Sequence, residues 1–266
     1  MTTPTARPAV LEAHQIVKVF DGTVALAGVD FRLDQGRVHA LIGENGAGKS
    51  TLLKVLAGIE PPTDGHLLVD GHVVRFASTR DAAARGIGMI HQELQLFPDL
   101  TVRENLFVGR ERCTRWGTVA WDAQEDAARR ALERLGHPSI SPRDRVGALS
   151  LGQQQIVEIA RALVHDVRVL LMDEPTSALS GAEVPVLFQV IRDLTRHGVS
   201  IVYISHRLEE LLAIADEVTV LRDGRVVGSA PAADVDVSWI VQRMTGGGSV
   251  RPAVEQATPP GLIQVV

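Results

Sequence analysis

GENGAGKS, residues 43–50, is the stretch that decides the fold class of this chain. It fits the pattern G-x-x-x-x-G-K-[ST], follows an apolar segment at residues 38–42, and precedes a helix-like segment at residues 50–57. Glycines let a backbone curl so that successive N–H groups point at phosphate oxygens, and the start of a helix adds positive potential. The flanking strand and helix disfavour the alternative, a glycine-rich turn with a chance Lys-Ser pair. The stretch therefore predicts a phosphate-binding loop.

The polar side chains of this loop suit a nucleotide and its metal. Lys49 supplies a mobile positive charge for the β- and γ-phosphates, and Ser50 offers a hydroxyl to Mg²⁺. We therefore expect ATP as the ligand and Mg²⁺ as its cofactor. The candidate ATP-binding residues here are Gly43, Asn45, Gly46, Ala47, Gly48, Lys49, Ser50 and Thr51.

A second stretch, VLLMDE at residues 169–174, predicts a buried strand that ends in two carboxylates. Asp173 can hold the metal through water, while Glu174 is placed to orient and polarise an attacking water. Adjacent carboxylates at a strand end can also be a plain solvated turn. The phosphate loop in the same chain favours the catalytic interpretation.

Composition excludes several classes of protein. The 266 residues carry 32 acids against 27 bases, a net charge of -5, which disfavours a broad basic surface for nucleic acid. The single cysteine, Cys113, excludes an internal disulfide. Residues 1–8 lack the apolar stretch of a secretory signal, and no run of about 18 apolar residues could cross a bilayer. We expect a chain that is soluble by itself.

Short strand-like runs alternate with longer helical stretches, which predicts an α/β fold with a largely parallel central sheet. Residues 10–33 indicate strands broken at residues 21–22, residues 66–76 a hairpin turning at residues 70–71, and a later hairpin turns at residues 223–224. Strands are also expected at residues 167–172 and 200–204. A helix is expected from residue 152 to 164, and Pro185 predicts a late start for the helix at residues 182–196.

The chain divides into a main domain and two ends. We expect residues 1–9 to be disordered and residues 10–245 to form the domain. Within it, residues 92–150 are expected to be a helical insert, because Ala127, Ala131, Leu132 and Leu135 share one helix face. Residues 246–266, rich in Gly, Pro and Thr before a final apolar run, indicate a linker and the possible start of a second half.

Several motifs together carry a resemblance to the ATP-binding-cassette (ABC) proteins. LSLGQ at residues 149–153 resembles the signature motif, HQE at residues 91–93 the Gln loop, and SAL at residues 177–179 the D-loop. His206, after YIS, resembles the switch histidine. Ser150 or His206 alone would more often be a helix cap or a surface group, but the order of the motifs disfavours chance. The resemblance spans about residues 10–246 and implies a P-loop ABC ATPase domain with an antiparallel β subdomain and a helical insert.

The resemblance also implies roles for particular residues. Two such domains pack head to tail, so that Ser150, Gly152 and Gln153 of one contact the γ-phosphate of ATP held by the other. Phe20 stands where an aromatic ring stacks on adenine, with a plain strand-core phenylalanine as the alternative. The implied catalytic residues are Lys49, Gln92, Glu174 and His206, and the implied metal-binding residues are Ser50, Gln92 and Asp173.

Within the ABC proteins, four stretches look like the importers of ribose, xylose, galactose and related monosaccharides: residues 88–94, 100–111, 149–160 and 201–207. In that family one polypeptide usually carries two ATPase halves, and this chain resembles the N-terminal half. A self-standing cassette that pairs with itself is the rival. One departure is Ser180, where many ABC proteins have Asp.

The implied partners are a second nucleotide-binding domain, membrane permease subunits and, indirectly, a sugar-binding protein, but no nucleic acid. The implied location is peripheral, at the cytoplasmic face of the cell membrane. Two alternatives share the ATP site: a soluble ABC ATPase acting on ribosomes or DNA, and a regulatory module that never hydrolyses ATP. The acidic balance disfavours the first, and Glu174 with His206 disfavours the second.

Overall fold

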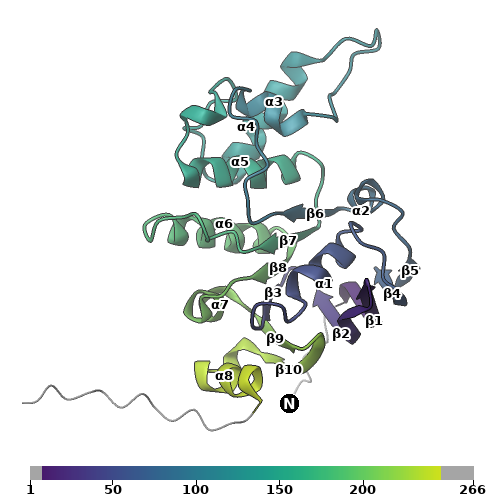
Figure 1. Ribbon diagram of the computed structural model, residues 1–266. Helices are drawn as coiled ribbons and strands as arrows, with labels where there is room; N and C mark the ends of the chain where they lie inside the picture. The colour runs from purple at the N-terminus through teal and green to yellow at the C-terminus, as the bar shows by residue number, and fades with distance from the viewer. Residues whose placement is uncertain (1–7, 247–266) are drawn as a thin grey trace, which may run out of the picture.

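A computed structural model describes residues 8–246, which form two sheets and their covering helices (Figure 1). The larger sheet has six strands in the order β10-β9-β3-β8-β7-β6, and every neighbouring pair is parallel except β9 with β10. The predicted, largely parallel core sheet is confirmed. Its strands are β3 (Val38–Ile42), β6 (Ile87–Ile90), β7 (Val169–Asp173), β8 (Ser200–Ile204), β9 (Glu217–Arg222) and β10 (Arg225–Pro231).

The smaller sheet is antiparallel, in the order β2-β1-β4-β5. The predicted hairpins turn where expected, because an aspartate and a glycine with positive φ follow one another, as at Asp70 (φ 50) and Gly71 (φ 74). This geometry lets the strands reverse with the right-handed twist that a sheet needs. The strands are β1 (Ala9–Phe20), β2 (Thr23–Asp34), β4 (Asp64–Val69) and β5 (His72–Val74).

The core sheet is buried on both faces because its strands alternate apolar side chains between them. In β7, Leu170 and Met172 join the hydrophobic core on one face, and Leu171 joins the core on the other. The helix α1 (Lys49–Leu56) fills the space between the two sheets, since its Leu52 and Leu53 belong to the same core as Leu171 and the antiparallel strands. The opposite face is covered by α6 (Val184–Arg196), α7 (Leu208–Ile214) and α8 (Val237–Thr245).

The segment between β6 and β7 is helical, as predicted, and lies at the end of the molecule farthest from α8 (Figure 1). Ala127, Ala131, Leu132 and Leu135 are all buried, so the expected helix face is confirmed. The helices α3, α4 and α5 contact one another, and the packing therefore continues past residue 150 into α5. Their bounds are α3 (Val102–Phe107), α4 (Trp121–Arg134), the short 3-10 helix η1 (Val146–Ala148) and α5 (Leu151–Leu163).

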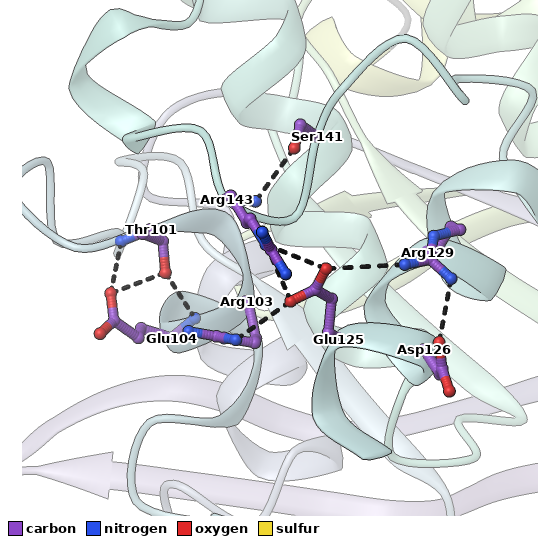
Figure 2. Close-up of polar contacts among 8 residues, drawn as sticks. All are labelled: Thr101, Arg103, Glu104, Glu125, Asp126, Arg129, Ser141 and Arg143. Atoms are coloured by element: carbon purple, nitrogen blue, oxygen red, sulfur yellow. Dashed lines mark hydrogen bonds and ion pairs between the residues drawn. The ribbon is translucent and has the colours of Figure 1, made fainter. Parts of the chain in front are cut away.

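A carboxylate in α4 ties this helical segment together (Figure 2). Glu125, whose side chain is only 14% exposed, pairs with Arg103 of α3 at 3.2 Å and with Arg143 of the following loop at 3.1 Å. Arg129, one turn further along α4, approaches the same carboxylate at 3.6 Å. Nearby, Thr101 and Glu104 form a capping box at the start of α3. Three guanidinium groups from three segments therefore converge on Glu125.

One buried histidine stands out in the core sheet. His39 of β3 is 2% exposed, its Nε2 lies 2.7 Å from Thr219 Oγ1, and its ring centroid lies 4.5 Å from that of Phe31. Burial lowers the pKa of His39 to about 4, because the charged imidazolium would lose its hydration. His39 is therefore neutral in the folded chain near neutral pH.

The remaining elements include some that the sequence did not predict. Pro185 lies in the first turn of α6, which begins at Val184, so the predicted late start is confirmed. The strand β6 and the helices α2 (Thr79–Ala84), η2 (Ala232–Asp234) and α8 were not predicted. Across residues 8–246, no helix combines the length and apolarity that a membrane span requires. The expected disorder over residues 1–9 is wrong at Ala9, which begins β1 because it pairs with Asp34 of β2; residues 1–7 lie outside the described residues. Of the expected linker and second half at residues 246–266, the structure describes only Gly246, the C-cap of α8.

Candidate active site

The predicted phosphate-binding loop, residues 43–50, lies between the carboxyl end of β3, a central strand of the core sheet, and the start of α1. Gly46 and Gly48 have φ values of 83° and 102°, a region that favours glycine. A Cβ atom on Gly48 would lie 2.7 Å from the carbonyl oxygen of Ala25, and one on Gly43 would overlap the carbonyl oxygen of Leu221. Glycine is therefore required at positions 43 and 48 for the loop to pack as it does.

The N-cap of α1 is Gly48, and no side chain within residues 8–246 accepts a hydrogen bond there to cap the helix. By contrast, α3 and α5 both begin with a complete capping box. The first N–H groups of α1 therefore remain available to an anion, and the partial positive charge of the helix start adds to the attraction. This arrangement fits a bound phosphate.

Lys49 is held over the loop by two hydrogen bonds. Its Nζ donates to the carbonyl oxygens of Gly43 at 2.8 Å and of Glu44 at 2.9 Å, and the residue is only 8% exposed. Burial lowers the pKa of Lys49, while the charges of Glu174 and Asp173 act in the opposite direction. The ammonium group is thus held within the loop and partly desolvated, which would strengthen its attraction to phosphate oxygens.

Asp173 lies at the end of β7 and faces the loop. The Ser50 hydroxyl donates to Asp173 Oδ1 at 3.3 Å. Burial raises the pKa of Asp173, while the hydrogen bond from Ser50 lowers it and the charge of Glu174 raises it again. A hydroxyl and a buried carboxylate are hard oxygen ligands, and a divalent cation would offset the buried negative charge, so the pair fits Mg²⁺.

Glu174, the next residue, is contacted by side chains that follow two other strands of the core sheet. It adopts a positive φ of 48°, and its N–H donates to the carbonyl oxygen of Ile204 at 3.0 Å. Its Oε2 lies 3.2 Å from His206 Nδ1 and 3.5 Å from Gln92 Nε2. Gln92 follows β6 and His206 follows β8, so residues far apart in sequence meet at the carboxyl edge of the parallel strands.

The structure places the signature-like residues elsewhere. Ser150 is the N-cap of α5, where its Oγ accepts from Gln153 N at 3.3 Å and its N–H donates to Gln153 Oε1 at 2.9 Å. Gly152 N donates to Glu183 Oε1 at 2.9 Å. Within residues 8–246, the hydrogen bonds of these three residues join them to one another, to their own helix and to Glu183, and none reaches residues 43–51.

The other candidates lie in or near the loop and differ in their exposure. Phe20 is 39% exposed at the end of β1, with Lys18 Nζ 4.6 Å from its ring centroid, so the alternative of a strand-core phenylalanine is wrong. Asn45 and Gly46 are exposed at the tip of the loop, Ala47 is buried, and Thr51 is partly buried in α1. The roles given to all these residues remain predictions.

Sequence reasoning missed Glu183, which bonds the signature-like loop. Its signal was the S-x-x-E pattern from Ser180 to Glu183, typical of a helix start. The pattern predicts a contact with Ser180, which exists at 2.8 Å between Ser180 Oγ and Glu183 Oε2. It could not predict the contact with Gly152, which lies 31 positions away.

Comparison with known proteins is consistent with this geometry. The model of the family described as ABC transporter matches residues 26–177, a region that includes the phosphate-like loop, the signature-like loop and both strand-end carboxylates. The chain belongs to the ABC transporter family. Solved ABC cassettes have the same fold. One, free of nucleotide, aligns with a TM-score of 0.76 and 26% identity over 88% of this chain and 98% of its own. Another, in its ADP conformation, aligns with a TM-score of 0.77 and 27% identity over 89% of this chain and 95% of its own.

Curated relatives of this chain carry names that refer to sugar import. A protein from Rhodopirellula baltica named ribose import ATP-binding protein is 52% identical over 89% of this chain and 46% of its own length. One from Burkholderia ambifaria is named putative ribose/galactose/methyl galactoside import ATP-binding protein 1. It is 50% identical over 97% of this chain and 48% of its own length. The chain therefore spans about half the length of the curated relatives that it matches.

Proposed function

We propose that this chain binds and hydrolyses ATP as the N-terminal nucleotide-binding half of a monosaccharide importer. The observation that carries the proposal is the meeting of Gln92, Glu174 and His206 beside the buried Lys49 and the Ser50–Asp173 pair. This is the set of groups that phosphoryl transfer to water needs: an anion cradle, a metal site and a carboxylate for the water. The names of the relatives support the importer assignment.

In the proposed reaction, the N–H groups at the start of α1 and the Lys49 ammonium bind the phosphates of ATP. Ser50 and Asp173 would hold Mg²⁺, which neutralises charge on the phosphate oxygens when bound. Glu174 orients the attacking water and accepts its proton. Gln92 and His206 hold the Glu174 carboxylate in position, and His206 would also donate to the γ-phosphate.

Hydrolysis in this proposal requires a second cassette. Ser150, Gly152 and Gln153 present a hydroxyl and backbone N–H groups at the start of α5, a helix of 13 residues, and that combination binds anions. Because the hydrogen bonds of these groups do not reach the phosphate loop of the same chain, we expect them to contact ATP held by another cassette. The second cassette is either the other half of the same polypeptide or a second copy of this one.

Coupling to transport would pass through the helical segment. A cavity of about 400 Å³ lies between that segment and the core sheet and is lined by His91, Gln95, Leu106, Arg161 and His165, among others. We propose this cavity as the docking site for a cytoplasmic segment of the permease, close in sequence to Gln92. The chain would then be held peripherally at the cytoplasmic face of the membrane, with the sugar-binding protein acting through the permease and no nucleic acid involved.

The test is the substitution Glu174→Gln, with Glu209→Gln as the control. Glu209 is an exposed carboxylate in the first turn of α7, 35 positions after Glu174. Glu174→Gln should lower kcat for ATP by roughly 10²- to 10⁴-fold, the usual contribution of a general base, while calorimetry shows ATP bound with nearly unchanged affinity. Unchanged turnover in Glu174→Gln would refute the assignment of the catalytic base.

A concentration series tests the need for pairing. Specific ATPase activity of the purified chain should rise with protein concentration, because each complete site needs two cassettes. An activity per chain that stays constant at all concentrations would contradict the paired site.

Purification in mild detergent from cells expressing the tagged native polypeptide should also recover a membrane permease, and recovery with ribosomes or DNA would overturn the importer assignment.

A further inference from the structure

Glu183 joins the start of α5, which belongs to the proposed pairing surface, to the turn before α6. One carboxylate oxygen, Oε1, accepts from Gly152 N at 2.9 Å and lies 3.5 Å from Ser150 Oγ, at the start of α5. The other, Oε2, accepts from Ser180 N at 3.0 Å and from Ser180 Oγ at 2.8 Å, in the turn before α6. The two oxygens of Glu183 therefore serve different partners.

A capping role at the α6 turn explains only one of these two sets of contacts. To cap this turn, the Glu183 side chain needs only one oxygen that accepts hydrogen bonds from Ser180, and Oε2 is that oxygen. The second oxygen lies where the positive end of α5 attracts an anion. The hydrogen bonds from Ser180 lower the pKa of Glu183 most strongly, followed by that from Gly152, so the group is an anion near neutral pH.

The contact also constrains the glycine of the signature-like loop. A Cβ atom on Gly152 would overlap Glu183 Oε1, so the observed contact requires glycine at this position. The site is open to the outside, since a cavity of about 170 Å³ lies beside it and is lined by Ser150, Gly152 and Glu183 among others. A phosphate arriving from another molecule can therefore reach the same donors.

We propose that Glu183 is a positioning residue that occupies the anion site at the start of α5 until the γ-phosphate of ATP on a second cassette displaces it. This inference rests on the proposed function, in which Ser150 and Gly152 receive that phosphate. The single N–H of Gly152 cannot donate fully to two anions, and a carboxylate beside a phosphate adds like-charge repulsion. Closure of two cassettes must therefore break the bond between Glu183 and Gly152.

Displacement of Glu183 from Gly152 would also affect the turn before α6. When Oε1 loses Gly152 and the longer contact with Ser150, the carboxylate keeps its bonds with Ser180 but no longer joins the turn before α6 to α5. Ser180 stands next to residues 177–179, the D-loop-like segment, which lies five residues or fewer from the Glu174 carboxylate in sequence. Arrival of the phosphate at α5 is thereby linked to the segment that follows the catalytic base.

The test measures pairing by analytical ultracentrifugation of the full chain with a non-hydrolysable ATP analogue and Mg²⁺. Glu183→Gln keeps the shape and one acceptor but removes the charge, and Glu133→Gln removes an equal charge from an exposed position on α4. Glu183→Gln should tighten nucleotide-dependent pairing by at least about tenfold, the effect of losing one competing hydrogen bond to a charged group. Glu133→Gln should leave it unchanged. A variant that merely loosened the fold would weaken pairing, so a gain identifies competition.

Hydrogen–deuterium exchange of the nucleotide-free chain gives a second readout that does not depend on pairing. Peptides covering residues 150–154 should exchange faster in Glu183→Gln and Glu183→Ala than in the wild type. Unchanged or weaker pairing in Glu183→Gln overturns the proposal, and so does unchanged exchange. If no protein pairs at any concentration, the paired-cassette function fails; faster exchange would then show that Glu183 holds the loop, and its competition with a partner's phosphate would be overturned.

Discussion

Lowering the pH should destabilise the fold through His39, because its imidazole is buried in β3 as a neutral ring. The unfolded chain exposes this side chain, whose ordinary pKa is 6.5, whereas burial lowers the pKa to about 4 in the folded chain. Between these two values the unfolded state binds the proton and the folded state does not. Stability from this residue is therefore present above about pH 6.5 and is lost as the pH falls toward about 4.

The magnitude follows from the two pKa values. A difference of about 2.5 units, at about 1.4 kcal/mol each, gives a limit of roughly 3 kcal/mol. At about pH 5 the unfolded side chain is almost fully protonated and the folded one almost fully neutral, so the free energy of unfolding should fall by about 2 kcal/mol relative to pH 7. This is a large part of the stability of a typical domain.

The assay is urea unfolding at about pH 7 and about pH 5, comparing the wild type with His39→Gln. Glu217 Oε2 lies 3.7 Å from His39 Nδ1, and burial raises the pKa of Glu217, so this carboxyl titrates in the opposite direction. The wild type should lose about 2 kcal/mol more than His39→Gln over this interval, while the exposed His66→Gln control should behave as wild type. Equal losses in the wild type and His39→Gln would refute the reasoning.

Two further substitutions test the loop and the helical segment. Lys49→Ala removes the ammonium bonded to Gly43 and Glu44 and should weaken Mg·ATP binding by about ten- to a hundredfold in calorimetry; unchanged affinity would contradict its role. Asn105→Ala should lower the free energy of unfolding by about 2–4 kcal/mol in urea, since the fully buried amide accepts from Phe97 N at 2.7 Å and donates to Phe97 O at 3.0 Å. A fall in the free energy of unfolding of less than about 1 kcal/mol would show that another group bonds the backbone N–H and carbonyl of Phe97 in the variant.

The features that could be predicted from the sequence are those determined by a few neighbouring residues. The stretches at residues 43–50 and 169–174 carry their structure in their own residue types, so the loop, the buried strand and the carboxylates at its end were predictable. The hairpin turns followed from their Asp-Gly pairs. The strand β6 was missed because it has only four residues and includes a glycine, Gly88, and so presents no clear period.

The contacts within the site depend on tertiary structure instead. Glu174 meets Gln92 across 82 positions and His206 across 32, distances over which spacing in sequence carries no geometric information. Their proximity could be expected only from the resemblance to ABC proteins. Glu183 was missed because its local pattern accounts for one of its oxygens and says nothing of the other.

The convergence on Glu125 has a mechanical consequence for the helical segment. Because guanidinium groups from α3, from α4 and from the loop before η1 share one carboxylate above an apolar core, a bend between α3 and α4 would separate charges as well as open that core (Figure 2). The segment should therefore behave as a stiff lever arm. Flexing is then concentrated at its two attachments to the core sheet: the stretch after β6, which contains Gln92, and the connection from α5 to β7.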